Sequence, residues 1–447
     1  IFNNLKDWKH KKKKKPLILK GARQVGKTHT LKEFGEKSFQ KYHYCNFEQR
    51  EDLHEIFKSN LDPKQIITSL NFKLETKIDV KKDLIIFDEI QNCPRALTSL
   101  KYFYEVMPEL HLCSAGSLLG LELNSNSFPV GKVEYLHLFP LSFEEFLRGI
   151  NDDLGYSFIE SFSFNKPETL LPSIHEHLWS KFKLYLITGG LPEIINTYNL
   201  FKFDLYEACL SVRNKQKELL TSYIADISKH SGKTNALHIE RIWKNIPLQL
   251  CKTQDSTSKR FRFKDIVPGL HSYTHLIHAF DWLLKANLAI ETPLIDNISM
   301  PIKTNIKENL FKLFMFDTGL LGMMADIPPK TLLEYGFGTY QGFFIENFIA
   351  QELKHLDNDE NRIYSWTHKS AEIEFVYDFG VKVGVVPMEV KSGWVTKSKS
   401  LKSYIDKYNP KCKVILSANQ ISINHKEDFY KVPTYLIAKL FKYFKAL

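Results

Sequence analysis

The stretch Pro16–Thr30, PLILKGARQVGKTHT, constrains the fold of this chain more than any other. Apolar residues that favour a strand run directly into Gly21, and a helical pattern begins after Gly26-Lys27-Thr28. This is the pattern G-x-x-x-x-G-K-[ST] in its required setting, between a strand and a helix. The two glycines permit a backbone wrap whose N–H groups point at an anion, and the helix N-terminus adds partial positive charge. The sequence therefore predicts a phosphate-binding loop.

Each part of this loop has an expected contact with a nucleoside triphosphate. Lys27 reaches the β- and γ-phosphates, and the Thr28 hydroxyl binds a magnesium ion. ATP and Mg²⁺ are the predicted ligands. The residues expected to bind the nucleotide are Gly21, Ala22, Arg23, Gln24, Val25, Gly26, Lys27, Thr28 and His29.

A second stretch, Asp83–Glu89 (DLIIFDE), places two acids at the end of an apolar strand, which is the form of a Walker B strand. We expect Asp88 to hold the magnesium ion through water. Glu89 is placed to orient and deprotonate the water that attacks the γ-phosphate. The interval after the loop leaves room for an additional strand between the two motifs. This favours ATPases with a catalytic glutamate over the kinase-like branch.

The stretch His111–Ser117 predicts the next strand, which ends in small hydroxyl residues. A polar side chain at that end would lie between the acids and the phosphates and would sense the γ-phosphate. We expect Ser117 to take this catalytic role in preference to Ser114. An ordinary turn at the strand end is the alternative.

Composition limits the class of protein and of partner. The 447 residues suggest about three domains. Hydrophobic residues make up 43% and charged residues 25%, which describes a globular chain and not a disordered one. The net charge of +10 favours an anionic partner such as DNA. Scattered cysteines suit a reducing compartment, and no apolar run reaches the roughly 18 residues of a spanning helix. We expect a cytoplasmic protein without a membrane partner.

Six pieces of the chain together carry a family resemblance: PLILKGARQVGKT, LIIFDEIQ, the AGS strand, FPLSFEEF, GGLPE at Gly189–Glu193 and FKLFMFDTGLLG at Phe311–Gly322. Their order resembles that of prokaryotic AAA-type ATP-binding proteins with a C-terminal domain of unknown function, DUF4143, over essentially the whole chain. The family has Gly-Arg where this chain has Gly131-Lys132, so a charge remains at that place without the planar fork of arginine.

The predicted fold is α/β and has three parts. A P-loop ATPase sheet of the AAA type with a helical lid is expected over residues 1–205. Residues 206–329 show long helical patterns and then a strand pair, which suggests a winged-helix domain, as the resemblance also implies. A restriction-endonuclease-like α/β domain of the PD-(D/E)xK type is expected over residues 330–447.

A histidine-bearing face is predicted on the helix that starts at His271. His271, His275, His278, Trp282 and Lys285 fall opposite the apolar face of that helix. A solvated face is the first expectation, and contact with nucleic acid or a partner is the second. A metal site is least expected, because no acid or cysteine joins the histidines.

The last part of the chain carries a candidate nuclease site. Beyond Pro328-Pro329 the expected order is helix, three strands, helix and strand, which is the core of the PD-(D/E)xK fold. Glu389 shares a strand face with Lys391, and Glu374 shares one with Glu372 on the preceding strand. Such carboxylates hold Mg²⁺ or Mn²⁺, and the lysine positions the attacking water. The expected metal ligands are Glu346, Glu374 and Glu389, and the expected catalytic residues are Glu374, Glu389 and Lys391.

Two functions stay open from the sequence. In the first, a Mg²⁺-dependent ATPase couples its nucleotide state to DNA binding or processing by the C-terminal domains. In the second, the protein is a non-cleaving ATP-driven switch whose C-terminal domain only binds nucleic acid or a protein. The family has Glu-x-Asp where this chain has Glu372-Ile373-Glu374, which keeps the second open. A homo-oligomer is open as well.

Overall fold

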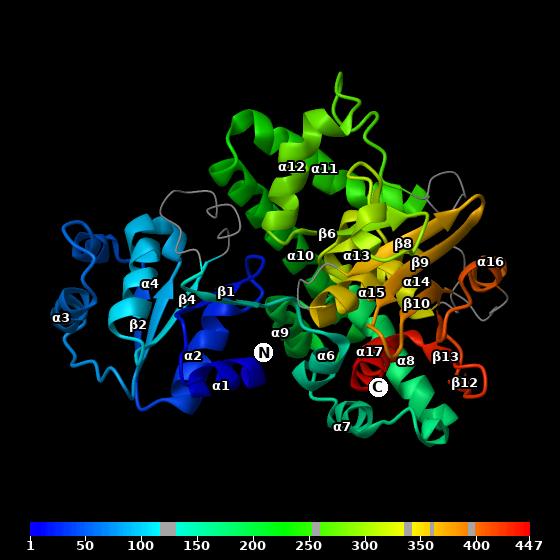
Figure 1. Cartoon of the computed structure of the whole chain (residues 1–447), viewed down its shortest axis with the longest axis horizontal. Coiled ribbons are helices and arrows are strands. Elements are labelled where there is room, and N and C mark those ends of the chain that lie inside the picture. Colours follow the sequence, from blue (N-terminus) through cyan, green and yellow to red (C-terminus); the bar gives the residue numbers. More distant parts are fainter. Residues whose placement is uncertain (117–130, 253–259, 335–341, 358–361, 392–397) are drawn as a thin grey trace. The chain divides into compact units, whose positions relative to one another are not determined.

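The computed structural model describes residues 1–116, 131–252, 260–334, 342–357, 362–391 and 398–447. These residues form two compact units (Figure 1). The first contains residues 1–139 with 285–287, and the second contains residues 140–284 with 288–447. No helix in the described ranges has the length and apolar character needed to cross a bilayer.

The first unit is built on a five-stranded parallel sheet in the order β2-β3-β4-β1-β5. Strands β3 and β4 are buried along their whole length, as expected for a parallel sheet with covered faces. Strand β2 lies between the two motifs in the sequence, so the additional strand predicted there is confirmed. Within the sheet, β4 separates β1 from β3. The strands are β1 (Leu17–Lys20), β2 (Tyr42–Asn46), β3 (Leu84–Asp88), β4 (His111–Ala115) and β5 (Glu134–His137).

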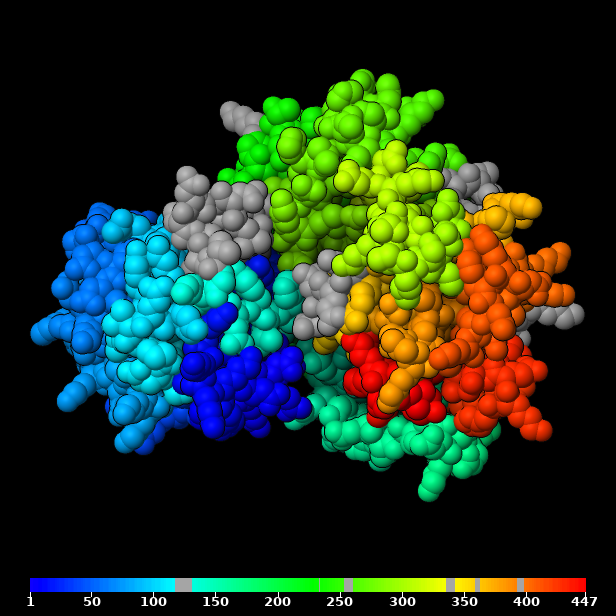
Figure 2. Space-filling model, viewed as in Figure 1, coloured from blue at the N-terminus to red at the C-terminus, as the bar shows by residue number. Residues whose placement is uncertain are grey.

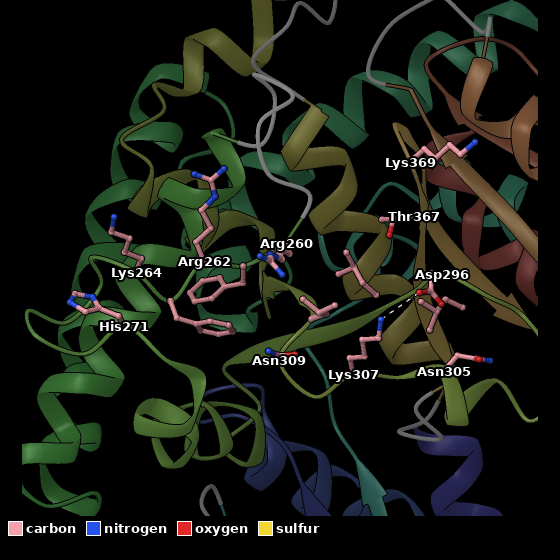
Figure 3. Close-up of a pocket in the computed structure, with 15 residues that line it drawn as sticks. Arg260, Arg262, Lys264, His271, Asp296, Asn305, Lys307, Asn309, Thr367 and Lys369 are labelled. Atoms are coloured by element: carbon pink, nitrogen blue, oxygen red, sulfur yellow. Dashed lines mark ion pairs between the residues drawn. The ribbon is translucent and has the colours of Figure 1, made fainter.

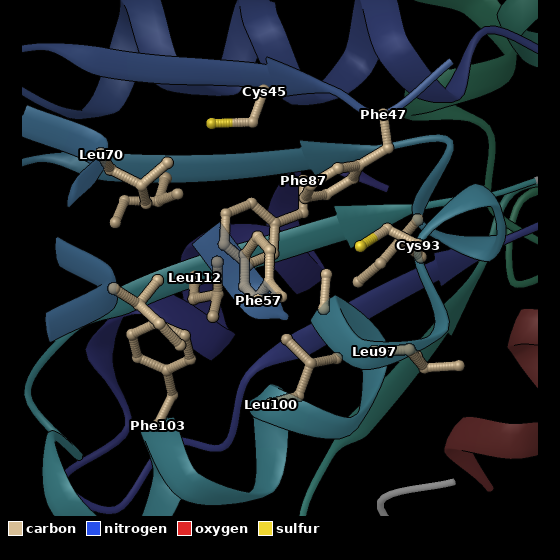
Figure 4. Close-up of a cluster of buried hydrophobic side chains, with 14 of the residues drawn as sticks. Cys45, Phe47, Phe57, Leu70, Phe87, Cys93, Leu97, Leu100, Phe103 and Leu112 are labelled. Atoms are coloured by element: carbon tan, nitrogen blue, oxygen red, sulfur yellow. The ribbon is translucent and has the colours of Figure 1, made fainter. Parts of the chain in front are cut away.

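The first unit also contains four helices: α1 (Phe2–His10), α2 (Lys27–Ser38), α3 (Pro63–Lys73) and α4 (Pro94–Val106). Aromatic rings form much of the core beside it (Figure 4). Phe87 of β3 lies with its ring centroid 5.4 Å from that of Phe47 and 5.8 Å from that of Phe57, in edge-on packing. This packing fixes β3, whose C-terminal end carries the two acids.

The second unit contains an eight-stranded sheet in the order β12-β13-β11-β10-β9-β8-β6-β7. Strand β6 pairs antiparallel with β7 and parallel with β8. The strand pair predicted for a winged helix therefore belongs to the same sheet as the C-terminal strands. The strands are β6 (Ala289–Ile295), β7 (Phe311–Met315), β8 (Ile363–His368), β9 (Ala371–Asp378), β10 (Val385–Val390), β11 (Lys413–Ser417), β12 (Ser422–Asn424) and β13 (Phe429–Pro433).

The helices of the second unit follow the predicted pattern closely. Beyond residue 341 the order α15, β8, β9, β10, α16, β11 confirms the predicted helix, three strands, helix and strand. The helices are α6 (Phe143–Gly149), α7 (Asp153–Ser161), α8 (Pro172–Thr188), α9 (Pro192–Phe201), α10 (Leu205–His230), α11 (Lys233–Lys252), α12 (Tyr273–Lys285), α13 (Thr318–Met324), α14 (Pro329–Glu334), α15 (Gly342–Asp357), α16 (Lys399–Tyr408) and α17 (Ile437–Ala446).

The segment predicted as a lid of the ATPase, within residues 140–205, contacts the C-terminal part of the chain. The ring of Phe164 lies 5.4 Å from that of Tyr443, and Lys442 forms an ion pair with Glu144 at 2.9 Å. Figure 2 shows α17 in red above the teal surface of this segment. By these contacts the helices within residues 140–205 group with the second unit, which begins at residue 140. The predicted domain boundary at residue 205 stays a prediction.

Two of the family motifs meet in the second unit and have a structural role there. Asp317 caps α13 by accepting a hydrogen bond from the Leu320 N–H (2.9 Å), and it also accepts one from the Gly190 N–H (2.7 Å). A Cβ on Gly319 would lie 2.4 Å from the carbonyl oxygen of Thr188. The GGLP and FDTG motifs therefore meet through a contact that only small residues permit.

On helix α12 the exposed face was predicted correctly for its histidines but wrongly for Trp282. His271, which precedes the helix, and His275 and His278 on it are exposed, as expected for a solvated face. Trp282, assigned to the same face, is instead only 6% exposed. The buried face of the helix extends sideways to Trp282, next to Ala279 and Leu283, because a large indole gains most from burial.

Candidate functional site

The phosphate-binding loop leaves β1 at Gly21 and opens α2 at Lys27. Gly26 has a φ of +96°, a conformation that favours glycine. A Cβ on Gly21 would lie only 2.2 Å from the carbonyl oxygen of Leu138. Ala22 and Val25 are buried, whereas His29 is exposed on α2. At Gly21 and Gly26, the two glycines of the motif, the loop therefore has a backbone without side chains.

Lys27 is buried beneath this backbone and is only 7% exposed. Its ammonium donates hydrogen bonds to the carbonyl oxygens of Gly21 (3.1 Å) and Ala22 (2.7 Å). Burial lowers the pKa of Lys27 to about 8, although the charges of Glu89 and Asp88 act against that shift. A buried ammonium held among carbonyl oxygens is suited to an anionic ligand, which would supply the opposite charge it lacks.

Asp88, at the end of β3, joins the loop to the neighbouring strand. Its Oδ2 accepts a hydrogen bond from the Thr28 hydroxyl at 2.8 Å and another from the Tyr44 hydroxyl at 2.7 Å. Asn46 in turn donates to the Tyr44 oxygen at 3.1 Å. Neither Tyr44 nor Asn46 was predicted as a site residue, although both lie at the polar C-terminal end of β2. Thr28 and Asp88 are oxygen ligands of the kind that Mg²⁺ prefers, so these residues fit the ion.

Glu89 follows Asp88 in an unusual backbone conformation, with a φ of +49°. Positive φ in a residue other than glycine is uncommon and is found preferentially at functional sites. Its Oε2 accepts a hydrogen bond from the Gln91 amide at 2.6 Å, a contact that was not expected from the sequence. The side chain of Glu89 is therefore held in a defined orientation beside Asp88.

The remaining predicted residues of this unit divide into three cases. Ser117 lies outside the described residues. Ser114 is fully buried within β4, between Ile18 of β1 and Phe87 of β3. Lys132 forms an ion pair with Glu105 at 3.2 Å.

Two carboxylates of the predicted nuclease-like cluster, those of Glu346 and Glu372, contact a lysine that was not predicted. The Lys312 ammonium lies 3.1 Å from Glu346 Oε2 and 2.6 Å from Glu372 Oε1, and its side chain is 8% exposed. Lys312 lies on β7, outside the region where a nuclease site was expected. The signal was present in FKLFM, a single charged residue inside an apolar strand.

Glu374 and Glu389 each have a different contact. Glu374 Oε2 accepts a hydrogen bond from the Val390 N–H at 2.9 Å, and Glu389 Oε1 lies 2.6 Å from the Lys391 ammonium. Burial, reinforced by the charge of Glu346, raises the pKa of Glu374 to about 8. Burial opposes the charge on Lys312, but Glu346, Glu372 and Glu374 together raise its pKa above the ordinary value.

These contacts do not suit the metal ion predicted for the cluster. Across the described ranges, no three His, Cys, Asp or Glu side chains are arranged to hold a metal ion. Glu346 already contacts the Lys312 ammonium, and Glu389 contacts that of Lys391. Each of the predicted ligands, Glu346, Glu374 and Glu389, thus already contacts an ammonium or an N–H of the protein.

Comparison with protein families agrees with the motifs. Residues 13–147 match the AAA domain, and residues 341–437 match the domain of unknown function DUF4143. The chain carries an AAA domain followed by a DUF4143 domain. Residues 180–331, between the two, match another domain of unknown function, DUF8612. The family resemblance is thereby confirmed, and the AAA domain accounts for the P-loop fold of the parallel sheet.

Solved structures give weaker likenesses. A Walker-type ATPase of Pyrococcus abyssi is 15% identical and covers 72% of this chain and 94% of its own, with a TM-score of 0.44. DnaA from Aquifex aeolicus with AMPPCP bound is 16% identical over 61% of this chain and 82% of its own, with a TM-score of 0.28. No curated protein matches the sequence.

Proposed function

We propose that the AAA domain binds ATP with Mg²⁺ and hydrolyses it. The observation that carries the proposal is the hydrogen bond from Thr28 to Asp88, with Glu89 next in the chain. This bond joins Thr28, the metal ligand expected from the loop, to Asp88, the metal ligand expected from β3. Thr28 and Asp88 would hold the ion, which supplies positive charge to the phosphates.

The residues of the AAA domain have separate roles in this proposal. The loop N–H groups and Lys27 bind the phosphates, since the buried ammonium would exchange carbonyl oxygens for phosphate oxygens. Glu89 accepts a proton from the water that attacks the γ-phosphorus, and ADP leaves as the bond from the γ-phosphorus to the β–γ bridging oxygen breaks. Gln91 holds the Glu89 carboxylate while it does so.

Thr28 gives a test with a matched control. Replacing Thr28 by valine removes the hydroxyl at almost constant shape, and we expect kcat/KM for ATP hydrolysis to fall about 10- to 100-fold. Thr28→Ser keeps the hydroxyl and should retain most of the activity. Phosphate release is measured at several Mg²⁺ concentrations. Equal rates for the valine and serine variants, or no release by the wild type, would reject the proposal.

We also propose that the nucleotide state controls how the second unit engages DNA. The support is a pocket of about 700 Å³ in that unit (Figure 3). Its charged lining consists of five cationic side chains and one carboxylate, besides His271. These are Arg260, Arg262, Lys264, Lys307, Lys369 and Asp296.

The sequence alternation explains how several of these cations come to line one pocket. In Arg260-Phe-Arg-Phe-Lys264 the alternate residues are exposed, while Phe261 is buried and packs 5.4 Å from Phe280. The Phe261 N–H donates to the Phe311 carbonyl at 2.8 Å, which fixes this extended segment beside β7. Lys369 reaches the same pocket from the turn between β8 and β9. Cations held on an extended segment suit a phosphodiester backbone.

Neutralising the pocket should weaken DNA binding. For the variant Arg262→Gln/Lys264→Gln/Lys369→Gln we expect the Kd for a DNA duplex to rise about 10- to 100-fold. The slope of log Kd against log salt concentration should also decrease, by an amount that corresponds to the loss of up to about three phosphate contacts. Fluorescence anisotropy with labelled duplex at several salt concentrations measures both. Lys58→Gln/Lys166→Gln/Lys229→Gln removes as many charges away from the pocket and serves as the control. If both triple variants bind alike, the pocket is not the DNA site.

The second candidate function is the non-cleaving switch, in which ATP controls binding alone. It is favoured by one observation, the ion pairs of Lys312 with two of the carboxylates in the nuclease-like cluster. The winged-helix and nuclease-like assignments, the three-domain division and a homo-oligomeric state stay predictions.

A further inference from the structure

Lys312 is a buried charge in an otherwise apolar strand. All five residues of β7 are buried, and the other four are Phe311, Leu313, Phe314 and Met315. Burying an ammonium is unfavourable unless carboxylates pair with it closely. Lys312 has two, Glu346 from α15 and Glu372 from β9. The lysine therefore joins three elements that lie far apart in the sequence.

The same two carboxylates cannot serve the lysine and a divalent cation together. Mg²⁺ and Mn²⁺ need carboxylate oxygens at about 2.0–2.2 Å. An oxygen that lies 2.6 or 3.1 Å from the ammonium would bring such an ion close to a second positive charge in a buried place. Either the ammonium or the metal ion occupies this position.

The ion pair of Lys391 with Glu389 also competes with a metal ion for a carboxylate. Lys391 was expected to position the attacking water, yet its ammonium lies 2.6 Å from Glu389, itself an expected metal ligand. Glu374, the third expected ligand, accepts the backbone hydrogen bond of Val390. All three expected ligands thus have a donor or a cation of the protein as their contact.

We propose that the Lys312 ammonium takes the place of a divalent cation, so that the carboxylates of the C-terminal domain are held together without metal and the domain does not cleave phosphodiester bonds by a metal-dependent route. The proposal deepens the non-cleaving alternative and rests on the nuclease-like interpretation of the cluster, but it is independent of ATP hydrolysis. The DUF4143 domain would then bind its partner with the fold of a nuclease and without its chemistry.

A manganese titration of the full chain tests this. Free Mn²⁺ is followed by electron paramagnetic resonance without nucleotide, and every protein carries Asp88→Asn so that the AAA domain does not contribute. We expect no Mn²⁺ site below millimolar concentration in this background. A site there that Glu346→Gln removes would overturn the proposal.

Replacing Lys312 tests the proposal in the opposite direction, because the variant is expected to gain a Mn²⁺ site. Lys312→Met, in the same background, should gain one Mn²⁺ site with a Kd at least 10-fold below that of the parent, and adding Glu372→Gln should abolish it. A folded Lys312→Met protein that gains no site would also overturn the proposal. If that variant does not fold, the parent and Glu346→Gln titrations decide alone. Because no nucleotide is present, failure of the proposed ATPase activity leaves these results unchanged.

Discussion

Replacing Glu89 by glutamine is expected to lower phosphate release from ATP by at least about 100-fold while leaving nucleotide binding in place. The substitution keeps the shape of the side chain and removes the carboxylate that, in the proposed mechanism, would accept the proton from the attacking water. Lys27, Thr28 and the loop backbone are untouched, so the ground-state complex should persist. The variant therefore separates binding of ATP from its hydrolysis.

Single-turnover phosphate release and equilibrium binding of a fluorescent ATP analogue measure the two steps for Glu89→Gln. Glu55→Gln is a suitable control, because that glutamate is exposed and pairs with Lys58 in the same turn. Unchanged single-turnover rates would show that another group activates the water. Loss of nucleotide binding would show that Glu89 holds the loop.

The change Lys27→Ala is expected to have the largest effect, a fall in kcat/KM of about 1,000-fold. It removes the buried ammonium that we propose binds the terminal phosphates, and, unlike Glu89→Gln, it should weaken nucleotide binding too. The carbonyl oxygens of Gly21 and Ala22 would also lose their donor.

Lys37→Ala lies on the same helix, with the lysine exposed and paired to Glu33, and controls for loss of charge on α2. Thermal unfolding of both variants separates loss of ligand binding from loss of fold. If Lys27→Ala hydrolyses ATP at the rate of Lys37→Ala, the phosphate-binding role of the loop is wrong.

Local patterns were enough to predict the AAA domain. The loop and the acidic end of β3 are short runs whose residue types are dictated by chemistry, and the strand between them followed from chain length. Tyr44 and Gln91 could not be assigned in the same way, because their contacts with Asp88 and Glu89 depend on side-chain directions that no spacing specifies.

The C-terminal part shows where such reasoning ends. The order of helices and strands beyond residue 341 was predicted because each element has its own apolar pattern. The pairing of β6 with β8 joins residues far apart in the sequence, and that pairing makes one sheet of two predicted domains. Lys312 enters the carboxylate cluster through this sheet, so its role could be recognised only once the pairing was known.

The continuous sheet has a consequence for any shortened version of this protein. A fragment starting at residue 330 would lack β6 and β7, leaving β8 paired with β9 on one side and without a strand on the side where β6 pairs with it. The unpaired N–H and C=O groups of such an edge can pair with another chain, which promotes aggregation. The fragment would also lack the ammonium that balances Glu346 and Glu372, so it could acquire an affinity for metal that the intact protein does not have.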